Sequence, residues 1–411
     1  TWDDPYDKTA GAARASFCAR ANFLTISDIN PSFDSDQVPG SYWNVRGGTS
    51  KFTGDIGTIN SELLAKTIGD VEALTNELFF IGEVGTNNDT APTPKSLTSL
   101  GRARGLSPEE PTKQGSFSAA AMAYYAKTVD LRTEAGLTGN QTVDTYAVAL
   151  SSPLPRNEAR MNSGRNISLV PFAKSIGGSG INRAKGNYQP TNQIVDFYVE
   201  QIANSSGATG PDYDAAINGG RYYARFQINY EDVEQGGDHD MDAIAEYTVQ
   251  VTASNTLQVI VRPTYQAGGM QQNMGYVISG TTKDGVYLVA QDESGNPAYY
   301  LNVPTASSVP NGCDSPTVPA GCAPLPTIGQ TPLTFEFTPS TTGGGASLLK
   351  DPLWYAAKWG GFIDRNSSGT PDLELEYSAD GDPAKTPDTY FLVQNPLKLR
   401  ESLKKAFDNI V

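Results

Sequence analysis

Two short acidic segments near the end of the 411-residue chain hold the residues best suited to chemistry. Residues 364–372 and 380–388 share the pattern D-x-[N/D]-x-x-x-T-P-D, and the second segment begins sixteen residues after the first. Oxygen-bearing side chains on alternate residues of a tight loop converge on one point, and Ca²⁺ takes six to eight oxygen ligands at about 2.3–2.6 Å. The pattern therefore predicts a repeated calcium-binding loop.

The first loop has the more complete set of oxygen ligands. Gly369 stands at loop position six, where the chain turns sharply, and Leu375 stands at position twelve, where the helix–loop–helix calcium motif has a bidentate glutamate. That motif is therefore not implied, and Glu374 or Glu376 is the alternative source of a further carboxylate. The predicted ligands are Asp364, Asn366, Ser368, Thr370 through its carbonyl oxygen, and Asp372.

The second loop is expected to be the weaker site, because Lys385 replaces the turning glycine. Its predicted ligands are Asp380, Asp382 and Asp388. The alternative interpretation of both loops is a pair of solvated turns, since Asp, Asn, Gly and Pro are the ordinary residues of turns.

A second candidate for chemistry surrounds the single histidine of the chain, His239, which is flanked by Asp238, Asp240 and Asp242. This cluster allows three interpretations: a hydrogen-bonded turn at the start of a strand, a structural cation site, or an acid–base pair of a metal-dependent hydrolase. A zinc site normally has more His or Cys ligands than this chain offers. The sequence also contains no G-x-S-x-G nucleophile elbow and no phosphate-binding Gly-Lys loop. We therefore expect a non-enzymatic protein.

Composition restricts the partners of the chain. A net charge of −15 and a pI of about 4.6 argue against nucleic acid, whose affinity comes from Lys and Arg, and favour cations. No apolar run approaches the length of a membrane-spanning helix, and no signal peptide opens the sequence. Because the chain starts at Thr1 rather than Met, we expect a mature or proteolysed piece of a longer protein.

Two of the three cysteines bracket a Pro-rich segment. A disulfide between Cys313 and Cys322 would close a loop of ten residues, with a stabilisation of roughly 2–3 kcal/mol. Such a bond forms in oxidising compartments, so it predicts an extracellular protein. Cys18 is then either a buried thiol or bonded to a cysteine upstream of Thr1.

Both ends of the chain carry signals of an α/β domain. A short apolar strand at 22–27 ends in Asp28, and a second core strand is expected at 144–150. Two helices are expected between these strands, one capped by Ser61 with an apolar face that reaches Phe79, and one at 116–132. After a helix that begins near 348 and is stopped by Gly360 and Gly361, a last strand at 390–393 and a last helix at 395–410 follow. The order predicts a parallel sheet with crossover helices.

The central part of the chain has a different pattern. Alternating apolar and polar residues predict antiparallel strands at 221–230, 244–252, 256–265, 275–280, 285–291 and 298–303. Residues 194–202 are predicted as a short helix, and the Gly-rich stretch 341–345 as a hinge. The predicted division is an α/β part at 1–155, a β-rich insert at 156–345, and a return to the α/β domain with the calcium loops at 346–411.

Several long strings of residues resemble known proteins. Residues 349–362 (LKDPLWYAAKWGGF), followed by a strand and the string NPLKL at 395–399, look like the end of a von Willebrand factor A-type domain. With QGGDHDMDA at 235–243, MGYVISGTTKDGVY at 274–287 and DTYFLV at 388–393, the chain resembles the PilC/PilY family of type IV pilus tip proteins.

The resemblance implies a partial von Willebrand factor A-like sheet interrupted by an antiparallel β insert. It also implies an adhesin or pilus assembly factor that is extracellular, at the cell surface or pilus tip. The implied partners are pilins or minor pilins, a host or abiotic surface, and domains absent from this chain. The alternative is a secreted metal-dependent hydrolase that uses residues 238–240.

The chain departs from the family pattern in two places. Proteins of this family usually continue into a C-terminal β-propeller, whereas this sequence stops at Val411, and the Asp-x-Ser-x-Ser adhesion motif of A-type domains does not occur in it. Asp28 is therefore expected at the end of a central strand without a complete metal site.

Overall fold

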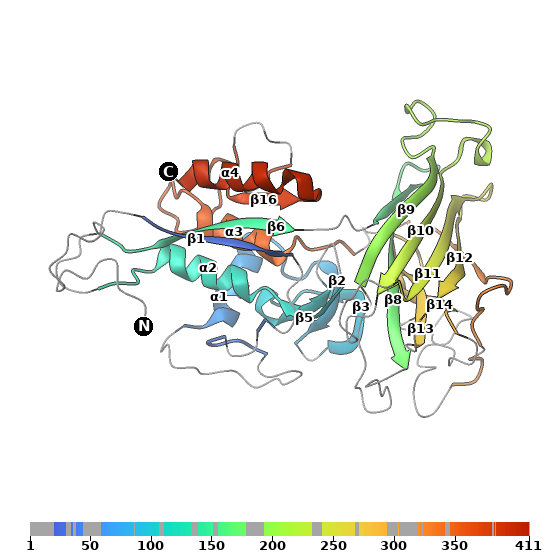
Figure 1. The fold of residues 1–411 in the computed structure, drawn as a ribbon, viewed down its shortest axis with the longest axis horizontal. Helices are drawn as coiled ribbons and strands as arrows, with labels where there is room; N and C mark the ends of the chain where they lie inside the picture. The colour runs from blue at the N-terminus through green and yellow to red at the C-terminus, as the bar shows by residue number, and fades with distance from the viewer. Residues whose placement is uncertain are drawn as a thin grey trace.

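The computed structural model comprises a mixed part that carries the helices and a β-sandwich beside it (Figure 1). The residues that the structure describes are 20–29, 34–35, 38–43, 59–85, 87–106, 111–133, 139–150, 155–177, 193–231, 241–267, 271–293, 303, 319–322, 324–341, 346–379, 382 and 384–410. Among them, no helix is both long and apolar enough to cross a membrane.

A three-stranded parallel sheet forms the centre of the mixed part. β6 (Val143–Leu150) lies between β1 (Ala21–Asp28) and β16 (Tyr390–Val393) and pairs in parallel with both. On one face, α2 (Ser118–Thr128) and α3 (Pro352–Gly361) pack on β6, with α1 (Ser61–Val71) against α2. On the other face, α4 (Leu399–Ile410) covers Val148 and Val393 (Figure 1).

A second, antiparallel sheet of the mixed part has the strand order β3-β2-β4-β5. The strands are β2 (Leu78–Val84), β3 (Asn87–Ser96), β4 (Ala103–Leu106) and β5 (Pro111–Ser116), with a 3-10 turn η1 (Leu100–Arg102) before β4. Residues between α1 and α2 therefore pair with one another and do not extend the parallel sheet.

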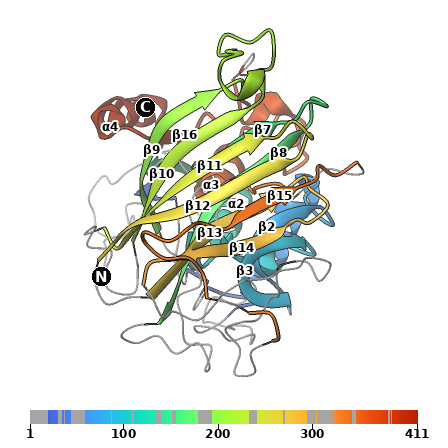
Figure 2. The same cartoon turned by 90° about the vertical axis from the view of Figure 1, so that its right-hand side faces the viewer.

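The β-sandwich packs a five-stranded sheet, β15-β12-β11-β10-β9, on a four-stranded sheet, β14-β13-β8-β7 (Figure 2). Their inner faces share one core that includes Phe226, Tyr247 and Tyr276. The strands are β7 (Asn157–Arg160), β8 (Asn166–Gly177), β9 (Gln193–Ala203), β10 (Tyr223–Glu231), β11 (Ala243–Val251), β12 (Leu257–Gln266), β13 (Gln271–Ser279), β14 (Gly285–Gln291) and β15 (Thr334–Phe337).

The outer face of the four-stranded sheet joins the sandwich to the mixed part. Phe80 of β2 and Ala346 pack there against Phe172 of β8 and Leu288 of β14. A backbone bridge pairs Phe79 with Ser347 beside this cluster. β14 is consequently buried along its whole length, because both of its faces are covered.

The predicted fold class is wrong. Only three described strands are parallel, and the other three sheets are antiparallel, so the described residues do not form a von Willebrand factor A-like α/β fold. No strand was predicted between the two helices, and there residues 78–116 form an antiparallel sheet of four strands.

Two predicted elements also need correction. Residues 194–202 are not a helix but lie in β9, where antiparallel pairing with β10 holds the segment extended. α1 ends at Val71, since Ala73 has a φ of 56° and the following residues enter β2, and its N-cap is Asn60 rather than Ser61.

Other predicted elements are confirmed. The strands expected at 22–27, 144–150 and 390–393 are β1, β6 and β16, and the five alternating segments from 221 to 291 are β10 to β14. The segment 298–303 lies outside the described residues except for residue 303. Residues 151–154 and 342–345, at the two expected boundaries, also lie outside them, so the division into 1–155, 156–345 and 346–411 stays a prediction.

Candidate cation-binding loop

The acidic segment connects α3 to β16, and both of its ends are fixed in the core. Asp351 caps α3 by accepting from the Trp354 N–H at 2.8 Å, and its second carboxylate oxygen accepts from the Tyr390 hydroxyl at 2.7 Å. At the other end of α3, Phe362 is buried, and the Thr389 hydroxyl donates to the Ala357 carbonyl at 2.9 Å. The acidic segment thus begins at α3 and ends at β16, which are neighbouring elements of the core.

Gly360 and Gly361 have a different role from the one predicted. They lie inside the last turn of α3 and are not among the residues with a positive φ, so they do not form a left-handed cap. A Cβ on Gly360 would lie 2.6 Å from the Cβ of Thr145, and one on Gly361 would lie 2.4 Å from the Oγ1 of Thr389. The two glycines are required because α3 approaches β6 and the start of β16 so closely.

In the first loop, the structure brings the predicted ligands together in a single turn. Two left-handed residues, Ser367 (φ 61°) and Gly369 (φ 75°), make this turn, as the prediction for Gly369 required. The Asp364 carboxylate accepts from the N–H groups of Ser368 at 3.2 Å and Gly369 at 2.9 Å. Asp364 therefore holds the turn from one side.

The remaining oxygens of this loop gather around the Ser368 hydroxyl. Its Oγ lies 2.8 Å from the Thr370 carbonyl oxygen and 2.9 Å from Oδ1 of Asp372. The Asn366 amide donates to the same Asp372 oxygen at 3.0 Å. These hydrogen bonds from Asn366 and Ser368 lower the pKa of Asp372 below its ordinary value, so the exposed carboxylate stays ionised.

Glu376 closes the neck of the first loop, a role that the sequence did not reveal. Its side chain is buried, with Oε1 accepting from the Arg365 N–H at 2.8 Å and Oε2 accepting from the Leu373 N–H at 3.0 Å. Glu374 forms an ion pair with Lys385 at 2.7 Å. Both glutamates proposed as further ligands are thus engaged with the protein itself.

Contacts from distant elements fix the loop to the mixed part. The Tyr124 hydroxyl of α2 donates to the Gly369 carbonyl at 3.1 Å. Glu72, directly after α1, accepts from the Trp359 indole N–H at 2.8 Å and pairs with Lys358 at 2.7 Å. Lys358 also lies over the Tyr377 ring, 3.9 Å from its centroid. These contacts join α1, α2, α3 and the acidic segment.

The second loop is arranged differently. Asp382 accepts from the N–H groups of Ala384 at 2.8 Å and Thr386 at 2.9 Å, and Asp388 accepts from the N–H of Ala379 at 3.0 Å. Among the described residues, no hydrogen bond joins the side chains of Asp382 and Asp388, and Asp380 lies outside them. Backbone N–H groups thus occupy the described carboxylates of this loop, and the Lys385 ammonium pairs with Glu374.

The first loop fits a calcium ion better than the second. The Ser368 hydroxyl lies within hydrogen-bond distance of both the Thr370 carbonyl and the Asp372 carboxylate, which is the spacing of oxygens that share one ion, and Asp364 adds a second carboxylate to the same turn. Each carboxylate oxygen also keeps acceptor capacity beyond the bonds described. Among the described residues, no group of three or more His, Cys, Asp and Glu side chains is placed to hold a metal ion. A calcium ion in the first loop would therefore need the Asn, Ser and carbonyl oxygens as well, and calcium binding stays a prediction.

The other predicted site residues cannot be assembled into a site. Cys322 packs against the sandwich core, but Cys313 lies outside the described residues, so their disulfide stays a prediction. Residues 238–240 also lie outside the described part, which leaves the hydrolase alternative untested. Asp28 ends β1, which is an edge strand of the described parallel sheet and not the central strand that was expected.

Comparisons with known proteins match both parts of the chain. The family described as PilY1 homolog, second domain, matches residues 1–126, and the family described as PilY1 homolog, beta-sandwich, matches residues 159–326. The second range covers most of the sandwich strands. No solved structure matches the chain.

A curated relative matches along the whole sequence. The type IV pilus biogenesis factor PilY1 homolog of Xylella fastidiosa is 45% identical over 426 aligned residues. The match covers 100% of this chain and 27% of the relative, so the chain spans about a quarter of the relative's length.

Proposed function

The chain belongs to the PilY1 homolog family, and on this premise we propose that it is part of a type IV pilus biogenesis factor. The observation that carries the proposal is the 45% identity to the Xylella fastidiosa pilus factor over the entire chain. The place of action is the cell exterior at the pilus tip, where pilins or minor pilins are the partners. An adhesive role toward a host or abiotic surface is part of the same proposal.

A calcium ion in the first acidic loop stabilises the acidic segment in this proposal. Asp364 and Asp372 place two carboxylates in one exposed turn, where a divalent cation offsets their repulsion. The loop leads from α3 to β16, so an ion there stiffens the connection between a buried helix and a strand of the parallel sheet. Because the ion binds the folded turn and not the unfolded chain, it raises the stability of the fold.

Deletion and complementation of the gene in the organism that carries it test the pilus function. Deleting the gene should reduce the number of surface pili counted by electron microscopy, and the wild-type gene should restore it. Attachment per pilus, measured separately on glass and on host cells, distinguishes assembly from adhesion. Unchanged pilus number and unchanged attachment after deletion would refute the proposal.

The same strain tests the role of the acidic loop. The double variant Asp364→Ala with Asp372→Ala should lower pilus number or attachment if the ion supports function. Asp408→Ala is the matched control, because Asp408 forms only an exposed pair with Lys404 on α4. If the double variant and the control show equal pilus number and equal attachment, the ion in this loop is not needed for the pilus function.

A further inference from the structure

β1 has a free side in the described part of the chain. It pairs with β6 along its whole length, from Ala21 with Val143 to Asp28 with Leu150. No other described strand pairs with it, so it is one edge of the three-stranded sheet. An unpaired edge presents a row of backbone N–H and C=O groups that can receive another strand.

The side chains of β1 are those of an interior strand. Phe23 is 59% exposed and Ile26 is 50% exposed, and because successive residues of a strand point to opposite faces, the two side chains lie on opposite faces of the sheet. Leu24, on the α4 side, already packs partly into the core beneath that helix. Parallel strands are ordinarily covered on both faces, so apolar side chains on both faces of an open edge indicate a sheet that continues.

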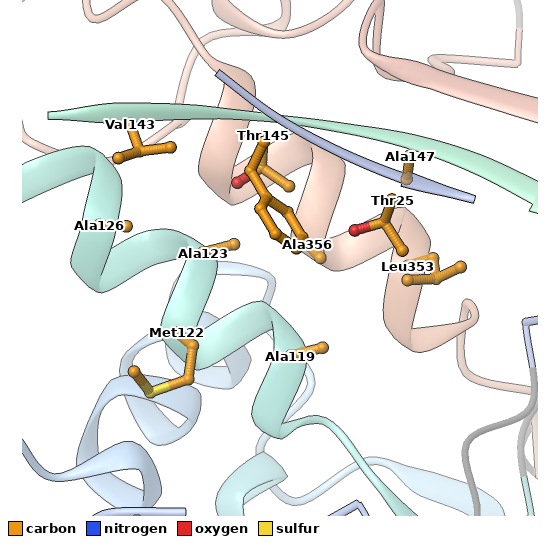
Figure 3. A pocket seen from close by; sticks show the side chains of 11 residues that line it. Thr25, Ala119, Met122, Ala123, Ala126, Val143, Thr145, Ala147, Leu353 and Ala356 are labelled. Atoms are coloured by element: carbon orange, nitrogen blue, oxygen red, sulfur yellow. The ribbon is translucent and has the colours of Figure 1, made fainter. Parts of the chain in front are cut away.

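A cavity lies beside this edge on the α2 side of the sheet. It has a volume of about 430 Å³ and extends from Phe23 and Thr25 of β1 to Met122 and Ala126 of α2 and Leu353 of α3. In Figure 3, side chains from strands β1 and β6 and from helices α2 and α3 surround one shared space. Its lining is apolar apart from two threonines, Thr25 and Thr145. A cavity with this apolar lining is suited to bind apolar side chains.

We propose that a β-strand from polypeptide flanking this region pairs with the free edge of β1 and places apolar side chains in the cavity. The sequence outside the matched region supplies the occupant, since the matched region is only 27% of the Xylella fastidiosa relative. Main-chain hydrogen bonds to β1 give the affinity, and the cavity selects apolar residues at alternate positions of the incoming strand. The parallel sheet of this chain is then the edge portion of a wider sheet.

Hydrogen exchange measured by mass spectrometry tests the pairing. The peptide that covers β1 is compared between the 411-residue chain and the full-length gene product. Pairing should slow exchange of the β1 amides by about tenfold or more in the longer protein, because paired amides exchange only through opening. The peptide that covers β16, at the opposite edge of the same sheet, should be unchanged.

Substitution of the exposed aromatic residue sharpens the test. Phe23→Asp should abolish the added protection of β1 in the full-length protein while changing the thermal midpoint of the 411-residue chain little. Ile328→Asp, at an apolar residue that is 44% exposed outside this edge, should leave the protection intact.

Two results would overturn the proposal. One is equal exchange of β1 in the short and long proteins. The other is protection of β1 that already occurs in the short chain and disappears on dilution, which would assign the edge to a second copy.

Discussion

At the scale of single residues, the carboxylates of the acidic segment have two separate roles. Glu376 is buried and accepts two backbone N–H groups, so it holds the neck of the first loop. Asp364 and Asp372 are exposed, and they are the residues proposed to bind the ion. The spacing of the sequence pattern predicted the turn at Gly369, which the structure confirms through its φ of 75°. The sequence pattern could not show that Glu376, rather than Glu374, is buried. That choice depends on how the 3-10 turn between the two loops packs.

The neck role of Glu376 predicts a loss of stability on truncation. Glu376→Ala leaves the N–H groups of Arg365 and Leu373 without their carboxylate, which should lower the free energy of unfolding by about 1–3 kcal/mol. Glu374→Ala is the matched control, because it removes only an exposed ion pair with Lys385, worth less than about 1 kcal/mol. Urea denaturation of both variants measures the difference. Equal losses would show that Glu376 does not hold the neck.

Asp372 predicts a dependence of stability on pH. Hydrogen bonds from Asn366 and Ser368 lower its pKa in the folded protein below the ordinary value of 3.8. Its contribution to stability is therefore fully present above pH 3.8 and is lost as the pH falls through the lowered pKa. In chelator, the difference in thermal midpoint between wild type and Asp372→Asn should shrink below pH 3.8. A constant difference at every pH would contradict this account.

At the scale of elements, α3 organises the mixed part. Nine of its ten residues are buried, and it contacts α2, β6 and β16. The sequence predicted the end of α3 at the double glycine, but it placed the start near 348 rather than at Pro352, and the predicted reason for the glycines, a left-handed cap, was wrong. Close approach to Thr145 and Thr389 is a tertiary contact, and local propensity carries no information about it.

The packing of α3 predicts that Gly360→Ala destabilises the protein. The added methyl group would lie 2.6 Å from Thr145 and 2.8 Å from Ala123, so helix and sheet must separate, at a cost of about 1–3 kcal/mol. Gly369→Ala is the informative comparison: its Cβ meets nothing within 4 Å, so only backbone strain of about 1–2 kcal/mol applies. Only Gly360→Ala should reduce the protection of the α3 and β6 amides from hydrogen exchange. Undisturbed protection there would contradict the packing argument.

The missed elements share one physical cause. Residues 194–202 have an apolar pattern compatible with a helix, yet pairing with β10 makes them β9. Leu78 and Phe79 continue the apolar face of α1 in the sequence, but Ala73 ends the helix and both residues enter β2. In each case pairing with neighbouring strands, β10 for β9 and β3 and β4 for β2, overrides the local preference. The alternating strands β10 to β12 were predictable because one of their faces is the sandwich core.

At the scale of the whole molecule, the sandwich and the mixed part are joined through the outer face of β8, β13 and β14. The apolar cluster around Phe80 and Phe172 makes this junction. The expectation of an A-type sheet was wrong because a strand–helix order does not determine how the intervening strands pair. The acidic loop belongs to the mixed part, since the Tyr124 hydroxyl of α2 donates to its Gly369 carbonyl. Calcium at this loop would therefore act on the part that contains the parallel sheet.

The most direct test of the calcium proposal is a calorimetric titration of Ca²⁺ into the metal-free chain. Wild type should bind with a measurable heat at the first loop, and Asp364→Ala with Asp372→Ala should lose that site. Asp408→Ala should titrate as wild type does, since Asp408 pairs with Lys404 on the exposed side of α4. A calcium titration of the double variant that is identical to that of wild type would contradict the account.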